Sequence, residues 1–414
     1  MQALPTDHWP SFYTAVLSAL CETEPQEATD LWRTLAEPQR CFVVEDRGAF
    51  IGTASLLSLR MTVPGGRLVD TGGSTMVSVQ PTHRGRGVLD ALMRHQLASL
   101  QRRGVPLAAL TASEAPGCGR FGYGVAARQL SLDVASSRVR IAGHSAGGDA
   151  VELTVEDPHE SLGACEEFYA RQVPLRPGML ARTDGWELLP LLDPPAWRQS
   201  ASPLRCVVAW MEGEVVGYAR YAVAVGWSRT NLAEGVVRVR DIEARDPGTY
   251  ATLWRFLLET ELTSRVIAPD RPVDEPVLHL ASDIRHCTPT VLDNLYLRVV
   301  DAPVALTART YATGLDVVME IHDDLAPWNR GCWRIEGDAG GAVCTRTYDA
   351  PDLSLDASAL GSAYLGGVTL TELAGAGRVR EHRPGALTTT TTAFASAVAP
   401  WLPFPFGRSL IPRL

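Results

Sequence analysis

In the first third of the chain, the spacing between hydrophobic residues changes several times. Three short stretches alternate as strands do, the first two of them around the turn Asp46–Gly48, and a fourth is continuously apolar like a buried strand. One longer stretch repeats its apolar residues every three to four positions and ends at Gly104, a typical helix stop. We therefore expect strands at Arg40–Glu45, Ala49–Leu56, Thr75–Gln80 and Pro106–Ala112, and a helix at Val88–Arg103.

The strand–loop–helix order of Thr75–Arg103 returns at Val236–Glu259 with a different loop. The first loop reads Arg-Gly-Arg-Gly (Arg84–Gly87), whereas the second contains Asp246 and Pro247. A carboxylate repels a phosphate, and proline has no N–H group to donate. The second segment is therefore interpreted as a structural copy that does not bind the ligand of the first.

Two changes of composition divide the rest of the chain, which at 414 residues is too long for one ordinary core. A Gly/Ser/Ala-rich stretch, Ser136–Asp149, is typical of a linker or loop. From about Leu295 short strands and helices follow, and the tail from Pro400 is too rich in proline and aromatic residues for a regular helix. These changes predict domains at residues 1–140, 141–294 and 295–414. Short elements of the last domain are expected at Val317–Ile321, Gly331–Ile335, Leu353–Leu360 and, as a helix, Leu370–Ala376.

Composition and charge narrow the classes of function. No apolar run approaches a membrane span and the N-terminus has no secretory pattern, so we expect a cytoplasmic protein without a membrane partner. The formal net charge of −9 argues against a nucleic-acid partner and is compatible with a cationic small molecule. All 38 basic residues are arginine, so the chain offers no lysine side chain to an acyl donor.

The eight cysteines are widely scattered, without a CxxC or Cys/His cluster of metal-ligand spacing. We therefore expect no metal site and reduced thiols. Seven of the cysteines are interpreted as small core residues, and Cys118 is set apart by its position in the chain.

The most informative stretch is VSVQPTHRGRGVLDALMRHQL, Val77–Leu97. Its glycine-rich loop leads into a helix N-terminus, where unpaired N–H groups and the helix dipole attract an anion. Two arginines add charge suited to a pyrophosphate. A P-loop would need a lysine and a Rossmann turn would need GxGxxG, so both are excluded. An ordinary strand-to-helix turn is the alternative, since a glycine-rich loop alone is a weak signal.

Several motifs together resemble the Enhanced intracellular survival (Eis) family of GNAT-superfamily N-acetyltransferases. They are MTVPG (61–65), VSVQPTHRGRG (77–87), ASEAPGCGRFGYG (112–124), LYLRVVDAPVALTARTY (295–311) and SALGSAYLGG (358–367). The resemblance covers essentially the whole chain. It implies an α+β (mixed α/β) architecture of an N-terminal GNAT domain, a degenerate central GNAT domain and a sterol-carrier-protein-like C-terminal domain. It also implies acetyl-CoA as co-substrate and a homo-oligomer, a hexamer in relatives.

The resemblance also assigns site residues. It implies that strand backbone binds pantetheine, that the helix N-terminus and its loop bind the pyrophosphate, and that two residues after the next strand complete the cofactor site. Glu22 and Trp32 fall where the family lines its amine pocket, and a carboxylate beside an aromatic ring suits an ammonium group. Taken alone, either residue is more often surface or core than pocket. The cofactor residues so assigned are Val77, Ser78, Val79, Arg84, Gly85, Arg86, Gly87, Val88, Leu89, Asp90, Ser113 and Glu114.

Two positions depart from the family pattern. Relatives use a tyrosine as the acid that protonates the leaving thiolate, and this chain has Cys118 there. A thiol has an ordinary pKa of about 8.5 against about 10 for tyrosine, but it is shorter by a ring. Three alternatives follow: Cys118 serves as the acid, Cys118 is a bystander while water or Tyr123 serves, or the acid step is absent. These three alternatives stay open at this point.

The second departure is at the C-terminus, where relatives use the chain-terminal carboxylate as the base. Alignment of the closing segment puts their terminal aromatic at Phe406, but this chain continues with Gly407–Leu414. The carboxylate of Leu414 acts as base only if those residues fold back to the cofactor. A frayed tail without such a base is the alternative.

The sequence thus predicts an N-acetyltransferase that moves the acetyl group of acetyl-CoA directly to a primary amine, such as an aminoglycoside, a polyamine or a lysine-like amine. Two alternatives remain. One is an acyl-CoA-binding protein with weak or no transferase activity, and the other is a biosynthetic acyltransferase for another acyl group.

Overall fold

The structure is a computed structural model that describes residues 2–4, 8–141 and 151–407. These residues form two compact units. The first unit combines Met1–Ala127, Arg176–Ala181 and the chain from residue 293 to 407, and the second combines Arg128–Leu175 with Arg182–Leu292. The predicted three-domain boundaries remain a prediction.

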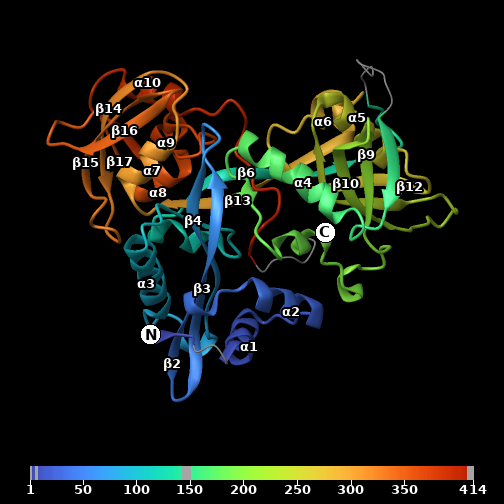
Figure 1. Ribbon diagram of the computed structural model, residues 1–414, viewed down its shortest axis with the longest axis horizontal. Coiled ribbons are helices and arrows are strands. Elements are labelled where there is room, and N and C mark those ends of the chain that lie inside the picture. Colours follow the sequence, from blue (N-terminus) through green and yellow to red (C-terminus); the bar gives the residue numbers. More distant parts are fainter. Residues whose placement is uncertain (1, 5–7, 142–150, 408–414) are drawn as a thin grey trace. The chain divides into compact units, whose positions relative to one another are not determined.

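The N-terminal part of the first unit is a sheet with helices on both sides. Its strand order is β1-β2-β3-β4-β5-β13, in which β4 and β5 are parallel and the other neighbours are antiparallel. Figure 1 shows α1 and α3 on opposite sides of β2, β3 and β4. The elements are β1 (Gln2–Ala3), α1 (Trp9–Leu20), α2 (Gln26–Leu35), β2 (Cys41–Asp46), β3 (Ala49–Thr62), β4 (Leu68–Val79), α3 (Val88–Arg102), β5 (Leu107–Leu110), β8 (Leu180–Ala181) and β13 (Cys287–Val299).

All four predicted strands and the predicted helix of this region are confirmed, with ends shifted by a few residues and with β3 and β4 longer than expected. The sequence prediction missed α1 and α2. The signal for α1 was present, because its buried residues Trp9, Phe12, Tyr13 and Val16 follow helical spacing. Gly52 on β3 lets α3 approach the sheet, since a Cβ atom there would stand 2.5 Å from Val88 Cγ1.

The C-terminal part of the first unit has its own sheet of order β16-β15-β14-β17-β18, with helices packed beside it (Figure 1). The predicted stretch Leu353–Leu360 is divided between a strand and a helix, because the Asp356 carboxylate accepts the Ala359 N–H at 2.6 Å and starts the helix there. The elements are α7 (Ala302–Ala308), β14 (Leu315–His322), β15 (Gly331–Asp338), β16 (Gly341–Arg346), β17 (Leu353–Asp356), α8 (Ala357–Ala363), α9 (Leu370–Gly375), β18 (Val379–Glu381) and α10 (Ala386–Phe394).

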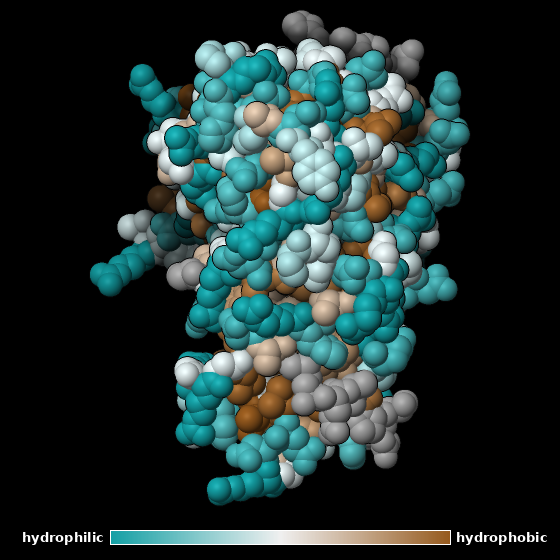
Figure 2. Space-filling model, turned by 90° about the vertical axis from the view of Figure 1, so that its left-hand side faces the viewer, coloured by the Kyte–Doolittle hydropathy of each residue, from teal (hydrophilic) through white to brown (hydrophobic). Residues whose placement is uncertain are grey.

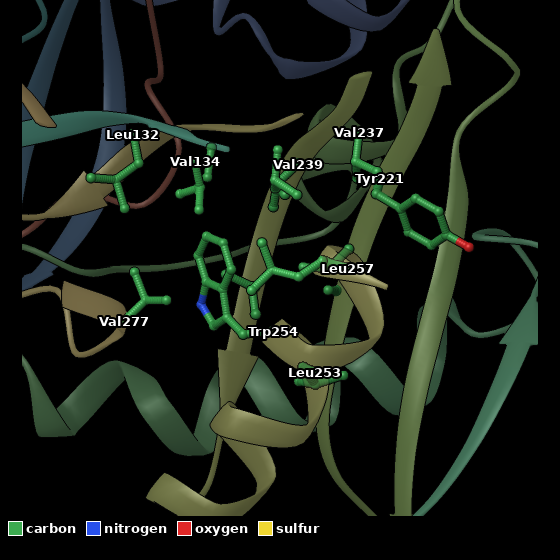
Figure 3. Packing of buried hydrophobic residues seen from close by; sticks show 14 of the residues in the cluster. Leu132, Val134, Tyr221, Val237, Val239, Leu253, Trp254, Leu257 and Val277 are labelled. Atoms are coloured by element: carbon green, nitrogen blue, oxygen red, sulfur yellow. The ribbon is translucent and has the colours of Figure 1, made fainter. Parts of the chain in front are cut away.

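The second unit is a mixed sheet of order β6-β12-β11-β10-β9-β7. The fully buried Trp254 of α5 packs among Leu132, Val134 and Val277 in its core, as Figure 3 shows. The elements are β6 (Gly124–Val134), β7 (Glu152–Glu156), α4 (Leu162–Gln172), β9 (Arg205–Met211), β10 (Glu214–Ala224), β11 (Gly235–Ala244), α5 (Pro247–Leu258), β12 (Thr263–Pro272) and α6 (Val277–Leu280).

Two sequence predictions fall in this unit. The repeated strand–loop–helix order is confirmed as β11 followed by α5. The predicted linker Ser136–Asp149 lies partly outside the described residues. Its first part is not a free linker, because Val139 is fully buried in the core cluster around Trp254.

Hydrophilic side chains cover most of the face drawn in Figure 2, and hydrophobic residues show between them. Such a mixture is normal for a protein surface. Within the residues that the structure describes, no helix is both long enough and apolar enough to cross a membrane.

Candidate active site

A bulge in β4 marks the segment predicted to bind pantetheine. The pairing of β4 with β3 slips by one residue between Thr75 and Ser78, and Met76 takes a positive φ of 52°. The Thr53 hydroxyl fixes this bulge by donating to the Met76 carbonyl at 2.9 Å and lying 2.7 Å from the Ser78 hydroxyl. The bulge therefore sets the orientation of the Val77–Val79 backbone.

The parallel pairing between β4 and β5 ends just before this bulge. The register of β4 with β5 runs only from Thr71 opposite Leu107 to Gly73 opposite Ala109. Beyond Gly73 the strand continues to Val79 without a register partner on β5. An extended chain such as pantetheine can hydrogen-bond to backbone groups left unpaired in this way.

The loop before α3 has the geometry of an anion site. Gly85 and Gly87 have φ of 74° and 77°, and a Cβ atom at either position would meet nothing within 4 Å. The backbone therefore requires glycine while the space above it is open to a ligand. Gly87 is the N-cap of α3 and supplies no side-chain cap, which leaves the first-turn N–H groups available to an anion.

Contacts to α1 and to the β2–β3 turn hold this loop in place. The Gln80 side chain donates to the Ala15 carbonyl at 2.9 Å, and Arg84 Nη2 donates to the Ala19 carbonyl at 3.4 Å. His83 Nε2 lies 3.5 Å from Asp46 Oδ2. These contacts fix the loop, and the exposed Arg84 and Arg86 add positive charge to it.

Three further predicted residues lie in the first turn of α3. The Val88 and Leu89 side chains pack against the buried cluster between α3 and the sheet. The Asp90 carboxylate pairs with Arg94 one turn later at 3.1 Å. That ion pair reduces the negative charge that Asp90 presents to a phosphate.

In the corresponding loop of the second unit, between β11 and α5, the Asp246 side chain caps the helix N-terminus. Asp246 is the N-cap of α5, and its carboxylate accepts the Thr249 N–H and the Thr249 hydroxyl, both at 2.9 Å. Burial favours the neutral acid, but the hydrogen bonds from Thr249 hold the pKa of Asp246 below its ordinary value. A carboxylate thus occupies the place that an anionic ligand would take at the N-terminus of α5.

Cys118 lies in the turn between the short helices Ala115–Gly117 and Gly119–Phe121. Its thiol lies 3.8 Å from the Glu114 carbonyl, to which it donates. Burial, and then the charge of Asp293, raise the pKa of the Cys118 thiol to about 11. The thiol is therefore a weaker acid than its ordinary pKa suggested, and the advantage over tyrosine that the sequence suggested is lost. Tyr123 is fully buried, and burial raises its pKa above the ordinary range.

The other predicted site residues lie in different surroundings. Val77, Val88, Leu89 and Cys118 all border the same buried cluster, so the structure brings these segments together. Ser113 and Glu114 are exposed beyond the end of β5, and Glu22 is exposed after α1. Trp32 is fully buried in α2 and belongs to the core side of that helix.

The C-terminal tail is ordered by side chains of the first unit as far as Gly407, and Leu414 lies outside the described residues. The Asn294 side chain exchanges two hydrogen bonds with the Leu402 backbone, at 3.1 and 3.2 Å. Arg176 Nη1 donates to the Ala399 carbonyl at 2.7 Å. Phe406, the position of the relatives' terminal aromatic, is 1% exposed. The tail up to Phe406 is therefore docked, whereas the fold-back of Gly407–Leu414 stays a prediction, because residues 408–414 lie outside the described residues.

The sequence prediction missed two polar residues beside Cys118. The Tyr296 hydroxyl donates to Asp293 Oδ2 at 2.8 Å, and both residues belong to the last part of β13. The Tyr296 phenol interacts electrostatically with Cys118. Tyr296 falls within the motif LYLRVV, but its place beside Cys118 depends on pairing between β13 and β5, which no local pattern indicates.

Among the described side chains, no group of three or more His, Cys, Asp or Glu residues is placed to hold a metal ion.

Comparison with known proteins supports the geometry of both units. Residues 1–126 and 178–299 each match an acetyltransferase (GNAT) domain family, and residues 302–403 match the sterol carrier protein domain family. The N-acetyltransferase Eis of Mycobacterium tuberculosis is 32% identical over 97% of this chain and 98% of its own length. The chain belongs to the Eis family of GNAT N-acetyltransferases.

Two further proteins are similar over the full length. An uncharacterized N-acetyltransferase of Streptomyces avermitilis is 50% identical over 98% of this chain and 99% of its own length. The crystal structure of Eis1 from Mycobacterium abscessus superposes with a TM-score of 0.83 at 31% identity and covers 97% of this chain and 98% of that one. The predicted fold class is confirmed, and the chain is an N-acetyltransferase whose GNAT domains imply acetyl-CoA as co-substrate.

Proposed function

We propose that this Eis-family enzyme transfers the acetyl group of acetyl-CoA directly to a primary amine of a small molecule. The observation that carries the proposal is the contrast between two helix N-termini. Gly87 leaves the first turn of α3 without a side-chain cap, whereas Asp246 fills the same position on α5. Only the first can accept the pyrophosphate of coenzyme A without displacing a carboxylate of the protein.

The proposed cofactor contacts follow the three segments that border the site. The Val77–Val79 backbone pairs with pantetheine, the Gly85–Asp90 amides with Arg84 hold the pyrophosphate, and Ser113 and Glu114 lie at the thioester end. The unpaired edge of β4 and the open space over Gly85 and Gly87 support this assignment. Direct transfer is favoured over a covalent acyl-enzyme, because burial keeps the thiol of Cys118, the candidate nucleophile, protonated.

The acceptor is proposed to be a cationic amine of the aminoglycoside, polyamine or lysine-like class. The net charge of −9 and the exposed carboxylates of Glu22, Glu114 and Asp293 favour a cation. Glu22 and Trp32 remain, by resemblance, the residues proposed to line the amine pocket, although Trp32 is fully buried in this structure. We further propose, also by resemblance, a cytoplasmic homo-oligomer, for which light scattering at micromolar concentration should give a mass well above 44.7 kDa. A monomeric mass would contradict that expectation.

Calorimetry and turnover test the proposal together. Titration with coenzyme A should give one site per chain, and acetyl-CoA should be consumed with at least one member of an amine panel. Two equivalent sites per chain would contradict the proposal that the α3 N-terminus, capped by Gly87, binds coenzyme A and the α5 N-terminus, capped by Asp246, does not.

A second candidate function, acyl-CoA binding with weak or no transfer, is favoured by the raised pKa of Cys118. Tight coenzyme A binding without amine-dependent turnover would establish it.

A further inference from the structure

Tyr296 reaches the Cys118 turn from a neighbouring strand. On β13 it lies opposite Leu110, the last residue of β5, and its side chain is 6% exposed in the cluster that also contains Phe121 and Tyr123. Cys118 packs against the same cluster. The Tyr296 phenol and the Cys118 side chain, which has no ring, therefore border the same buried cluster.

Asp293 links this phenol to solvent. It accepts the Tyr296 hydroxyl hydrogen bond at 2.8 Å and is itself exposed. An exposed carboxylate exchanges protons with water, while its hydrogen-bonded partner is shielded. The pair thus joins a buried proton donor to the bulk solvent through one contact.

The other two candidate acids of this region are poorly placed. The Cys118 thiol donates to the Glu114 carbonyl at 3.8 Å. The Tyr123 hydroxyl is enclosed in the core. Burial raises the pKa of Tyr296 as well, and Asp293 and Cys118, the titratable groups that act on it, raise it further. Tyr296 therefore stays protonated at neutral pH, as a proton donor must.

We propose that Tyr296, hydrogen-bonded to Asp293, donates the proton to the leaving sulfur of coenzyme A and thereby supplies the acid that position 118 lacks. This proposal rests on the transferase function proposed above. It adds a residue to the reaction and leaves the cofactor site unchanged.

All protons and electron pairs are accounted for in this transfer step. When the thioester C–S bond breaks, the sulfur keeps the electron pair, the Tyr296 O–H bond breaks and an S–H bond forms. The Tyr296 oxygen then takes a proton from Asp293, which had received it from solvent, and the carboxylate and the phenol are restored. The substrate ammonium loses two protons overall, of which one is balanced by the thiol and one stays in solvent.

The test compares two acetyl donors. Tyr296→Phe should lower kcat with acetyl-CoA by about 10–100-fold and change KM for acetyl-CoA by less than about twofold, because the lost interaction belongs to the transition state. The S-acetyl ester of an aromatic thiol has an acidic leaving group that departs without help. With that donor, Tyr296→Phe and wild type should agree within about threefold.

Matched variants separate a chemical role from a structural one. Tyr123→Phe removes another buried phenol hydroxyl from the same cluster and should leave both rates unchanged. Cys118→Tyr added to Tyr296→Phe should restore turnover, because the ring returns to position 118. Asp293→Asn keeps an acceptor for Tyr296 but cannot deliver a proton, so it should also lower kcat with acetyl-CoA. Because Asp293 is exposed, we expect this variant to keep the fold.

Three results would overturn the proposal. They are an unchanged rate of Tyr296→Phe with acetyl-CoA, an equal loss with both donors, and no effect of Asp293→Asn. Each leaves the proposed transferase function standing as long as the wild type acetylates an amine. A wild-type chain that binds coenzyme A but acetylates no amine would overturn both proposals.

Discussion

Gly407 lies directly beside Thr111, such that a Cβ atom built on Gly407 would stand 2.4 Å from the Thr111 hydroxyl oxygen. Thr111 follows the last residue of β5, and Phe406 immediately before Gly407 is buried. A peptide carbonyl therefore stands at the position where a chain ending at Phe406 would place its carboxylate. The family resemblance implies a terminal carboxylate as base at this position, where this chain has a peptide carbonyl.

Removal of residues 407–414 should raise the rate of amine acetylation by about tenfold, because it creates a carboxylate at Phe406 that can accept the amine proton. The measurement is kcat as a function of pH with acetyl-CoA and an active amine. The gain should appear above the pKa of the new carboxylate. A slower enzyme would indicate instead that the native tail supplies the base.

Replacement of Gly87 by valine should weaken coenzyme A binding by at least about tenfold, since a side chain with positive φ would fill the space over the α3 N-terminus. Gly104→Val is the matched control. Gly104 follows the other end of α3, has φ of 68° and is equally open, so it introduces the same backbone strain away from the site. Calorimetry at one temperature compares the two variants. Equal affinities would remove Gly87 from the cofactor site.

Asp246→Ala should lower the free energy of unfolding by about 1 kcal/mol at neutral pH without changing coenzyme A affinity, because an N-cap is lost from α5. The pKa of Asp246 is lowered in the folded chain, so its contribution is present above its unfolded pKa of about 4 and is lost as the pH falls through the folded value. Urea unfolding at pH 7 and pH 3 should therefore show a difference that shrinks at the lower pH. A change in coenzyme A affinity would contradict the interpretation of the second loop.

Cys118 should resist alkylation at neutral pH. With a pKa of about 11, only about one thiol in a thousand is ionised at pH 8, and the thiolate is the reactive form. The exposed Cys21 is the control within the same chain. Mass spectrometry after iodoacetamide treatment should find Cys21 labelled first and Cys118 labelled faster as the pH rises. Equal labelling rates at pH 8 would show that the thiol is not protected.

Local patterns predicted the parts of the fold in which neighbours along the chain decide the structure. The period change at Val88 predicted α3, and the contrast between Gly87 and Asp246 predicted that only one loop can bind an anion. The N-cap geometry of Asp246 agrees with that interpretation. The linker predicted at Ser136–Asp149 was wrong for its first part. Small residues suggested a free linker, but Val139 is buried in the core.

The amino-acid sequence by itself determined the family, the fold class, the glycine-rich anion loop and the loss of a tyrosine at position 118. These depend on the identity and spacing of residues within short segments. Only the tertiary structure decided that Tyr296 and Asp293 lie beside Cys118, that the tail docks as far as Gly407, and that burial raises the pKa of the Cys118 thiol. Those properties arise from strand pairing, side-chain contacts and burial between segments more than 100 residues apart along the chain. The spacing of hydrophobic residues within one segment carries no information on such contacts.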